Sequence, residues 1–286
     1  MRVLVAASFA FMVALGAEQA PAQDVLIRGA RVHTVSARGV LDAADVLIRD
    51  GKIARVGRGL VAPAEATVVQ ADGRALTPGL FGGLLQIGVR EISAESSTVD
   101  AGFNAQAPVW NPQWRPEFDA TLAYNPHSVL IPVARLGGLT WAMLAPSGND
   151  SLFAGQGAAV TLDGRYDAVL NGSRSLFVQL GSGGSESSGG SRAAQYMLLD
   201  QAVGEARSQS PEWPGAALRP AGKAVLAGYL AGGRVVFRVE RAADIRQAIA
   251  FARRNGLRPV ISGGSEAWRV AHELAQAHVP VILNTL

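Results

Sequence analysis

Thr77-Pro78-Gly79-Leu80, followed by Phe81-Gly82-Gly83-Leu84-Leu85-Gln86-Ile87-Gly88, separates two different patterns in this chain. Before this stretch, residues 24–75 read as short alternating strands that turn at glycines and contain no helix. After it, short continuous apolar runs alternate with helical patterns, as expected of parallel strands that are covered on both faces. The stretch therefore predicts a boundary between a β-rich module and an α/β unit.

The N-terminal module, residues 23–76, is predicted to be a small β-sandwich. Asp50-Gly51 stands between two alternating apolar runs. This dipeptide favours a two-residue hairpin turn, because both turn positions need a positive φ.

The second unit, residues 77–286, is predicted to be a (β/α)8-type barrel built from strand–helix–strand units. The expected strands are 80–87, 139–145, 174–180, 233–239, 258–262 and 279–283.

Three helices are expected between these strands. The first is capped by Ser191, the second covers 242–254 and ends at Gly256, and the third is capped by Ser265. Their predicted inward faces are Ala194, Met197, Leu198 and Ala202 in the first; Ile245, Ala248, Ile249 and Ala252 in the second; and Trp268, Ala271, Leu274 and Ala275 in the third.

Two stretches look irregular. Residues 93–128 carry four prolines and two tryptophans and suggest an insertion over one barrel end. Residues 181–190 are glycine and serine with one glutamate, which favours a flexible loop. Their glycines could also cradle a phosphate, although the stretch lacks the spaced glycines and lysine of a P-loop.

The composition limits the class of protein. The 286 residues include no cysteine, which rules out disulfides and thiolate metal sites. The net charge of +3 comes from scattered basic residues, so we do not expect nucleic-acid binding. Residues 1–22 resemble a bacterial export signal that ends at Ala20-Pro21-Ala22, which predicts a periplasmic or secreted protein; the alternative is a retained N-terminal anchor. No later apolar stretch is long enough to span a membrane.

A β-module, then Ala75-Leu76-Thr77-Pro78-Gly79-Leu80, then a (β/α) series resembles the amidohydrolase superfamily, and in particular its exported, imidazolonepropionase-like group. The resemblance runs from about residue 24 to the end of the chain. Further stretches that support it are Gly137-Gly138-Leu139-Thr140, Phe153-Ala154-Gly155-Gln156-Gly157, Ser191-Arg192-Ala193-Ala194 and Arg241-Ala242-Ala243-Asp244-Ile245.

The resemblance implies hydrolysis of a non-peptide C–N bond by a water bound to zinc or another divalent ion, whose pKa the ion lowers to about 7. The family's ligands are a His-x-His pair on strand 1, histidines on strands 5 and 6, and an aspartate on strand 8. In this chain the pair falls on Leu84 and Gln86, and the two single histidines fall on Arg238 and Gly263. We therefore expect no metal or other cofactor in this chain and impaired catalysis.

The last expected strand, 279–283, matches the seventh strand of the family's barrel, and the chain stops just after it, so the barrel is expected to be truncated before strand 8. A barrel that is not closed leaves an unpaired edge. The chain could thus be a fragment, or it could pair with an amidohydrolase-like subunit.

The remaining polar residues leave two alternatives. Gln86, Arg238 and Glu240 could form a small-molecule pocket in which Arg238 binds an anion. Alternatively, Arg238 or Arg241 forms a structural ion pair with Glu240 or Glu266, which is the interpretation that we favour. His33, His127, His272 and His278 are expected at surface positions, and their spacing matches no metal site. The sequence leaves two functions open: an amidohydrolase-like protein, or a non-catalytic binding or assembly subunit that uses the barrel mouth or the open edge.

Overall fold

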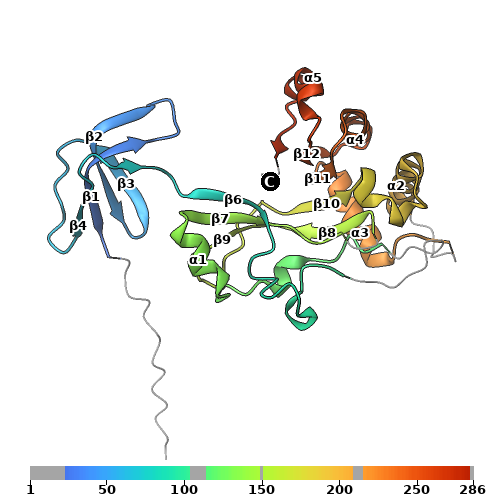
Figure 1. Cartoon of the computed structure of the whole chain (residues 1–286), viewed down its shortest axis with the longest axis horizontal. Coiled ribbons are helices and arrows are strands. Elements are labelled where there is room, and N and C mark those ends of the chain that lie inside the picture. Colours follow the sequence, from blue (N-terminus) through green and yellow to red (C-terminus); the bar gives the residue numbers. More distant parts are fainter. Residues whose placement is uncertain (1–22, 104–113, 149–150, 209–214, 284–286) are drawn as a thin grey trace, which may run out of the picture. The chain divides into compact units, whose positions relative to one another are not determined.

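A computed structural model describes residues 23–103, 114–148, 151–208 and 215–283 (Figure 1). The predicted export signal, residues 1–22, lies outside the described residues. The chain divides into two compact units after Pro78.

The first unit is one five-stranded sheet. Its strands are β1 (Val25–His33), β2 (Val40–Arg49), β3 (Lys52–Gly57), β4 (Thr67–Gln70) and β5 (Ala75–Leu76), in the order β3-β2-β1-β4 with β5 also on β1. The predicted turn between β2 and β3 is confirmed, since Asp50 and Gly51 have φ values of 49° and 70°. The predicted second layer of a sandwich is not seen among the described residues, which form this single sheet.

The second unit contains two sheets. The three-stranded sheet has the order β6-β7-β9, and the five-stranded sheet has the order β13-β12-β11-β10-β8. Their bounds are β6 (Leu80–Leu85), β7 (Leu139–Leu144), β8 (Phe153–Gly157), β9 (Ala159–Thr161), β10 (Ser175–Gln179), β11 (Arg234–Val239), β12 (Arg258–Gly263) and β13 (Val281–Ile282). All six expected strands are present, but the described strands do not form a closed barrel.

One unpredicted segment connects the two sheets. β8 pairs antiparallel with β10, and β9, which begins two residues after β8 ends, pairs antiparallel with β7. Glycine makes this segment possible, because a Cβ on Gly157 would lie only 1.9 Å from the carbonyl oxygen of Leu144. The structure therefore replaces part of the expected parallel series by an antiparallel link.

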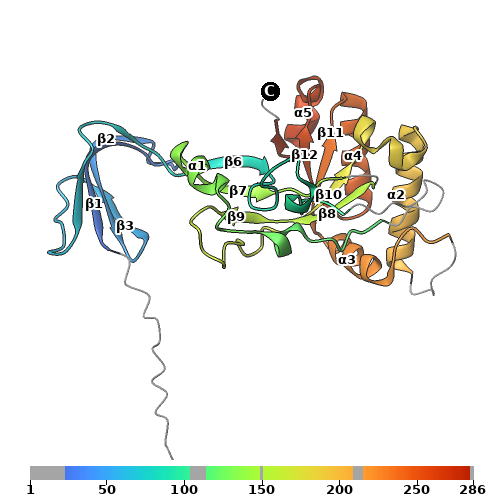
Figure 2. The same ribbon diagram turned by 60° about the horizontal axis from the view of Figure 1, so that its bottom comes forward.

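The helices follow the strands as in an α/β protein (Figure 2). They are α1 (Leu130–Leu136), α2 (Arg192–Arg207), α3 (Pro220–Leu230), α4 (Ala242–Arg254) and α5 (Ala271–Gln276). Short 3-10 turns are η1 (Ser96–Thr98), η2 (Ala120–Ala123), η3 (Gly181–Gly184), η4 (Glu186–Ser188) and η5 (Ala267–Val270). Within the described residues, we find no helix that is both long enough and apolar enough to cross a membrane.

The predicted helix ends and faces have mixed outcomes. Ser191 does cap α2 by accepting from the Ala194 N–H, and α4 has the predicted bounds and buries Ile245 and Ala248. The face predicted for α2 is partly wrong: Ala202 is buried and Leu198 packs against the core as expected, but Met197 is 64% exposed and the side chain of Gln195 is buried instead. The Gln195 amide is satisfied at both ends by the backbone N–H and C=O of Gly181, which explains its place inside.

The helix predicted after Ser265 is also different. Ser265 does not cap it; its N–H and hydroxyl donate to the carboxylate of Glu240 instead. The segment begins as the turn η5, and its inward residues are Ala267, Val270 and Leu274, whereas Trp268 is 73% exposed.

The two irregular stretches are partly ordered by turns. Residues 93–128 contain η1 and η2 and the fully buried Trp114, while positions 104–113 lie outside the described residues. The glycine-serine stretch 181–190, expected to be a loop, forms η3 and η4 and buries Ser187 and Ser188.

The five-stranded sheet of the second unit has an apolar layer on each face. On one face, α2, α3 and α4 pack against side chains such as Val235, Phe237 and Val239. On the other face, strands from both sheets pack together through Leu84, Met143, Ala145, Ala154, Phe177, Val236, Val260 and Ile282. This apolar layer between the two sheets resembles a barrel interior and forms the base of the candidate site.

Candidate functional site

The same change from apolar to polar occurs near the carboxyl ends of five strands. In β10, β11 and β12, an apolar residue of the inner layer is followed two positions later by a polar residue, and the same step occurs where the chain leaves β6 and β7. Residues two apart in a strand lie on the same face, so these polar residues form a second layer above the apolar one. The pairs are Leu84 and Gln86, Ala145 and Ser147, Phe177 and Gln179, Val236 and Arg238, and Val260 and Ser262.

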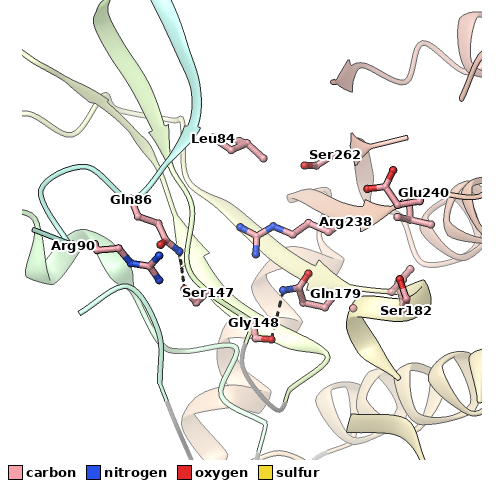
Figure 3. Close-up of a pocket in the computed structure, with 13 residues that line it drawn as sticks. Leu84, Gln86, Arg90, Ser147, Gly148, Gln179, Ser182, Arg238, Glu240 and Ser262 are labelled. Carbon is pink, nitrogen blue, oxygen red and sulfur yellow. Dashed lines mark hydrogen bonds between the residues drawn. The ribbon is translucent and has the colours of Figure 1, made fainter. Parts of the chain in front are cut away.

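A cavity of about 540 Å³ opens over this polar layer (Figure 3). All five polar residues line it, together with side chains and backbone from the segments that follow the strands. These further residues are Leu84, Arg90, Gly148, Leu180, Ser182, Gly183, Val239 and Glu240. The cavity thus lies at the carboxyl ends of the strands, where α/β proteins usually bind ligands.

Two glutamine amides hold the wall of the cavity in place. Gln86 Nε2 donates to Ser147 Oγ at 2.6 Å and to the Ala145 carbonyl oxygen at 3.4 Å. In the orientation that satisfies both ends of the amide, Gln179 Oε1 accepts from Arg238 Nη1 at 3.2 Å and from the Gly148 N–H at 3.3 Å. The opposite amide orientation, drawn in Figure 3, has Gln179 Nε2 donating to the Gly148 carbonyl oxygen at 3.5 Å.

Arg238 extends from β11 into the cavity over the ring of Phe177, with the guanidinium carbon 5.3 Å from the ring centroid. Among the described residues, no carboxylate forms an ion pair with it. Burial lowers the pKa of Arg238 to about 10, so the guanidinium still carries its charge at neutral pH. The structure therefore places an unbalanced positive charge at the centre of the polar layer.

Arg90 brings a second guanidinium to the same cavity from the segment after β6. Its Nε is buried and has no hydrogen-bond partner among the described residues. Figure 3 shows Arg90 and Arg238 reaching into the cavity from opposite sides.

Glu240 is the acidic residue that lines the cavity, but its carboxylate is committed to a turn. It accepts hydrogen bonds from the N–H of Ser265, at 2.9 Å, and from the Ser265 hydroxyl. A Cβ on Gly263, whose φ is +88°, would lie 2.1 Å from Glu240 Oε1. No side chain therefore fits at residue 263 unless Glu240 moves.

The favoured structural ion pair is wrong. In the described parts of the chain, Arg238 pairs with neither Glu240 nor Glu266, and Arg241 lies 3.9 Å from Asp244 instead. Glu266 accepts from the Ala242 N–H and thereby helps to hold the start of α4.

The side chains of the polar layer do not fit a divalent metal. The amides of Gln86 and Gln179 already bind neighbours, and amides and hydroxyls such as those of Ser147 and Ser262 are weak metal ligands. The guanidinium groups of Arg90 and Arg238 repel a cation. The described residues contain no group of three His, Asp or Glu side chains that could hold a metal ion. The histidines lie elsewhere: His33 ends β1, His127 contacts Tyr166, and His272 and His278 are exposed.

Gln86, Arg238 and Glu240 therefore line one cavity, as the sequence suggested for a small-molecule pocket, whereas Arg241 and Glu266 do not. The sequence interpretation missed Arg90, Ser147, Gln179, Ser182 and Ser262. The step from an apolar to a polar residue two positions later would have identified Ser147, Gln179 and Ser262. No comparable signal marks Arg90.

No protein-family model matches the chain. Two curated proteins are similar in sequence: a dihydroorotase from Geobacter sulfurreducens, 46% identical over 58 residues, and an adenine deaminase from Deinococcus radiodurans, 36% identical over 131 residues. A solved amidohydrolase from Thermotoga maritima MSB8 has the same fold, with 22% identity and a TM-score of 0.76. These findings support a place in the amidohydrolase superfamily.

The extent of each match differs. The dihydroorotase match covers 20% of this chain and 13% of that protein, and the adenine deaminase match covers 46% and 21%. The match to the Thermotoga maritima amidohydrolase covers 92% of this chain and 70% of that one. The second unit is thus consistent with the (β/α)8-type fold of that amidohydrolase, although its two sheets do not close into a barrel among the described residues.

Proposed function

We propose that this chain is an amidohydrolase-like member of the C–N hydrolases that binds a small molecule without a catalytic metal of its own. The observation that carries the proposal is the polar layer. Gln86, Ser147, Gln179, Arg238 and Ser262 offer neither an imidazole nor a carboxylate at the strand ends. A cavity with this lining suits hydrogen bonding and charge pairing with a ligand better than activation of water by a metal.

The proposal has a second form, in which the chain is a non-catalytic binding or assembly subunit. The open sheet edges favour assembly, because β6 and β13 each pair with one neighbouring strand in the described structure. Edge strands with free backbone groups are suited to pairing with another polypeptide. The imidazolonepropionase-like grouping and an exported location remain part of the proposal.

Metal content tests the proposal directly. After incubation of the full chain with zinc or manganese and removal of free ions, we expect less than about one ion per chain by elemental analysis, because too few ligands are present. Hydrolysis of dihydroorotate and deamination of adenine, the reactions for which the two curated relatives are named, would be assayed alongside. Stoichiometric metal together with a chelator-sensitive activity would contradict a metal-free protein.

A further inference from the structure

Two guanidinium groups without carboxylate partners enter one cavity, and this arrangement needs a physical explanation. A buried charge is costly unless it is paired, and buried Arg side chains are usually fixed by carboxylates. Within the part of the chain that the structure describes, Arg238 has the Gln179 amide and the Phe177 ring as neighbours, and the Nε of Arg90 has no partner. Both guanidinium groups thus line the cavity without forming an ion pair among the described residues.

The cavity contains a net positive charge that matches a single anion. Its charged lining consists of Arg90, Arg238 and Glu240. The Glu240 carboxylate is already bonded to Ser265. A ligand with one negative charge would bring the charge of this site to zero.

The cavity also has an apolar neighbour. A second cavity of about 440 Å³ shares Leu84, Gln86, Arg90 and Arg238 with the first. Its other lining residues are Leu85, Ile87, Leu130 and Ala145. The two arginines therefore line both a polar cavity and an apolar one.

We propose that the two neighbouring cavities together bind an organic monocarboxylate, with the carboxylate between Arg90 and Arg238 and an apolar body against Leu85, Ile87 and Leu130. A planar carboxylate can accept two parallel hydrogen bonds from a guanidinium, which favours it over a spherical anion. Hydroxyls of Ser147, Ser182 and Ser262 line the same polar space and supply further donors. This inference rests on the proposed small-molecule site, but its test does not depend on metal content or on hydrolysis.

Calorimetric titration of the full chain with phenylacetate, phenylacetamide, acetate and phenyl phosphate tests the ligand class. We expect phenylacetate to bind at least about tenfold more tightly than phenylacetamide, which lacks the charge, and than acetate, which lacks the apolar body. Equal affinity for phenylacetate and phenylacetamide, or no binding of phenylacetate at millimolar concentration, would overturn the proposal. Tighter binding of phenyl phosphate would overturn the assignment of a monocarboxylate.

Three variants locate the binding site. Arg238→Met and Arg90→Met each keep an apolar stem and should weaken phenylacetate at least about tenfold, because each removes a charge-assisted bond. Arg253→Met is the matched control, since Arg253 lies exposed in the last turn of α4 and should leave the affinity unchanged. Circular dichroism of each variant verifies folding. Unchanged binding by folded Arg238→Met would show that the anion does not use this guanidinium.

Discussion

Asp45 in the first unit is a buried charged group and Arg238 in the second is a half-buried one, and the fold satisfies the charge of Asp45 but not that of Arg238. Asp45 is 4% exposed, and its two carboxylate oxygens accept from the N–H groups of Gly29 and Leu60, each at 2.9 Å. Arg238 has one amide and one aromatic ring near it and no carboxylate among the described residues. The difference indicates that Asp45 serves the fold, whereas Arg238 serves the cavity.

The two groups also differ in how burial affects the pKa. Burial would raise the pKa of Asp45, but hydrogen bonds from Gly29 and Leu60 and the charge of Arg28 together hold it below its ordinary value. For Arg238, burial alone lowers the pKa, and no neighbouring carboxylate offsets it. Partners stabilise the charged form of Asp45, while the environment of Arg238 disfavours its charged form.

The largest expected change in stability comes from removing the Asp45 carboxylate, whose charge is satisfied by hydrogen bonds. Asp45→Ala leaves the N–H groups of Gly29 and Leu60 without acceptors and should destabilise the first unit by about 3 kcal/mol. Hydrogen–deuterium exchange with mass spectrometry of the full chain reports peptides of this unit separately from the second. Asp42→Ala is the control, because the Asp42 side chain is 74% exposed and its loss should change little. Equal protection in the Asp45 and Asp42 variants would show that the buried carboxylate does not hold the sheet.

Removing the Arg238 guanidinium, which has no ion-pair partner among the described residues, should change stability less and in the opposite direction. Arg238→Met replaces a buried cation by an apolar side chain over Phe177, and we expect β11 and β12 to gain about 1 kcal/mol in protection. The same exchange experiment measures it, with Arg253→Met as the exposed control. A loss of stability in Arg238→Met would mean that the guanidinium is structural, and the contrast with Asp45 would then fail.

The parallel strands were predictable because their signal is local and strong. The runs 233–239 and 258–262 each have an apolar centre, Val235-Val236-Phe237 and Pro259-Val260-Ile261, and the structure places β11 and β12 there within one residue. β8 was missed because Phe153-Ala154-Gly155-Gln156-Gly157 has no β-branched residue, and its place in the sheet depends on close contacts that only glycine allows. β9 was missed because it is only three residues long.

Hydropathy alone could not predict which side of α2 faces the core, because buried polar residues lie on that side. Gln195 lies on the buried side of α2, where its side-chain oxygen accepts from the Gly181 N–H. Glu205 lies on the same side and accepts from the N–H groups of Ala217 and Leu218. These bonds join residues twelve to fourteen positions apart, beyond the reach of a periodicity argument.

The candidate site was predictable in part for a similar reason. Gln86, Arg238 and Glu240 follow apolar strands, and the topology of a parallel sheet brings strand ends together. Arg90 comes from a segment without regular structure, so its place in the cavity depends on the whole fold. Whether Arg238 binds Glu240 also depended on a local competitor, Ser265, whose hydrogen bonds to Glu240 have no sequence signature.

The smallest effect in this comparison is the response of Asp45 to acid. Because its folded pKa is depressed, its contribution to stability is fully present above the ordinary Asp pKa near 3.9 and is lost as pH falls through the folded pKa. In an NMR titration of the full chain, we expect the amide signals of Gly29 and Leu60 to shift together with a midpoint below that ordinary value. The same amides in Asp45→Asn should not titrate in this range. A midpoint at or above the ordinary value would show that burial outweighs the two backbone donors, and Asp45 would then resemble Arg238 in being held against its charged form.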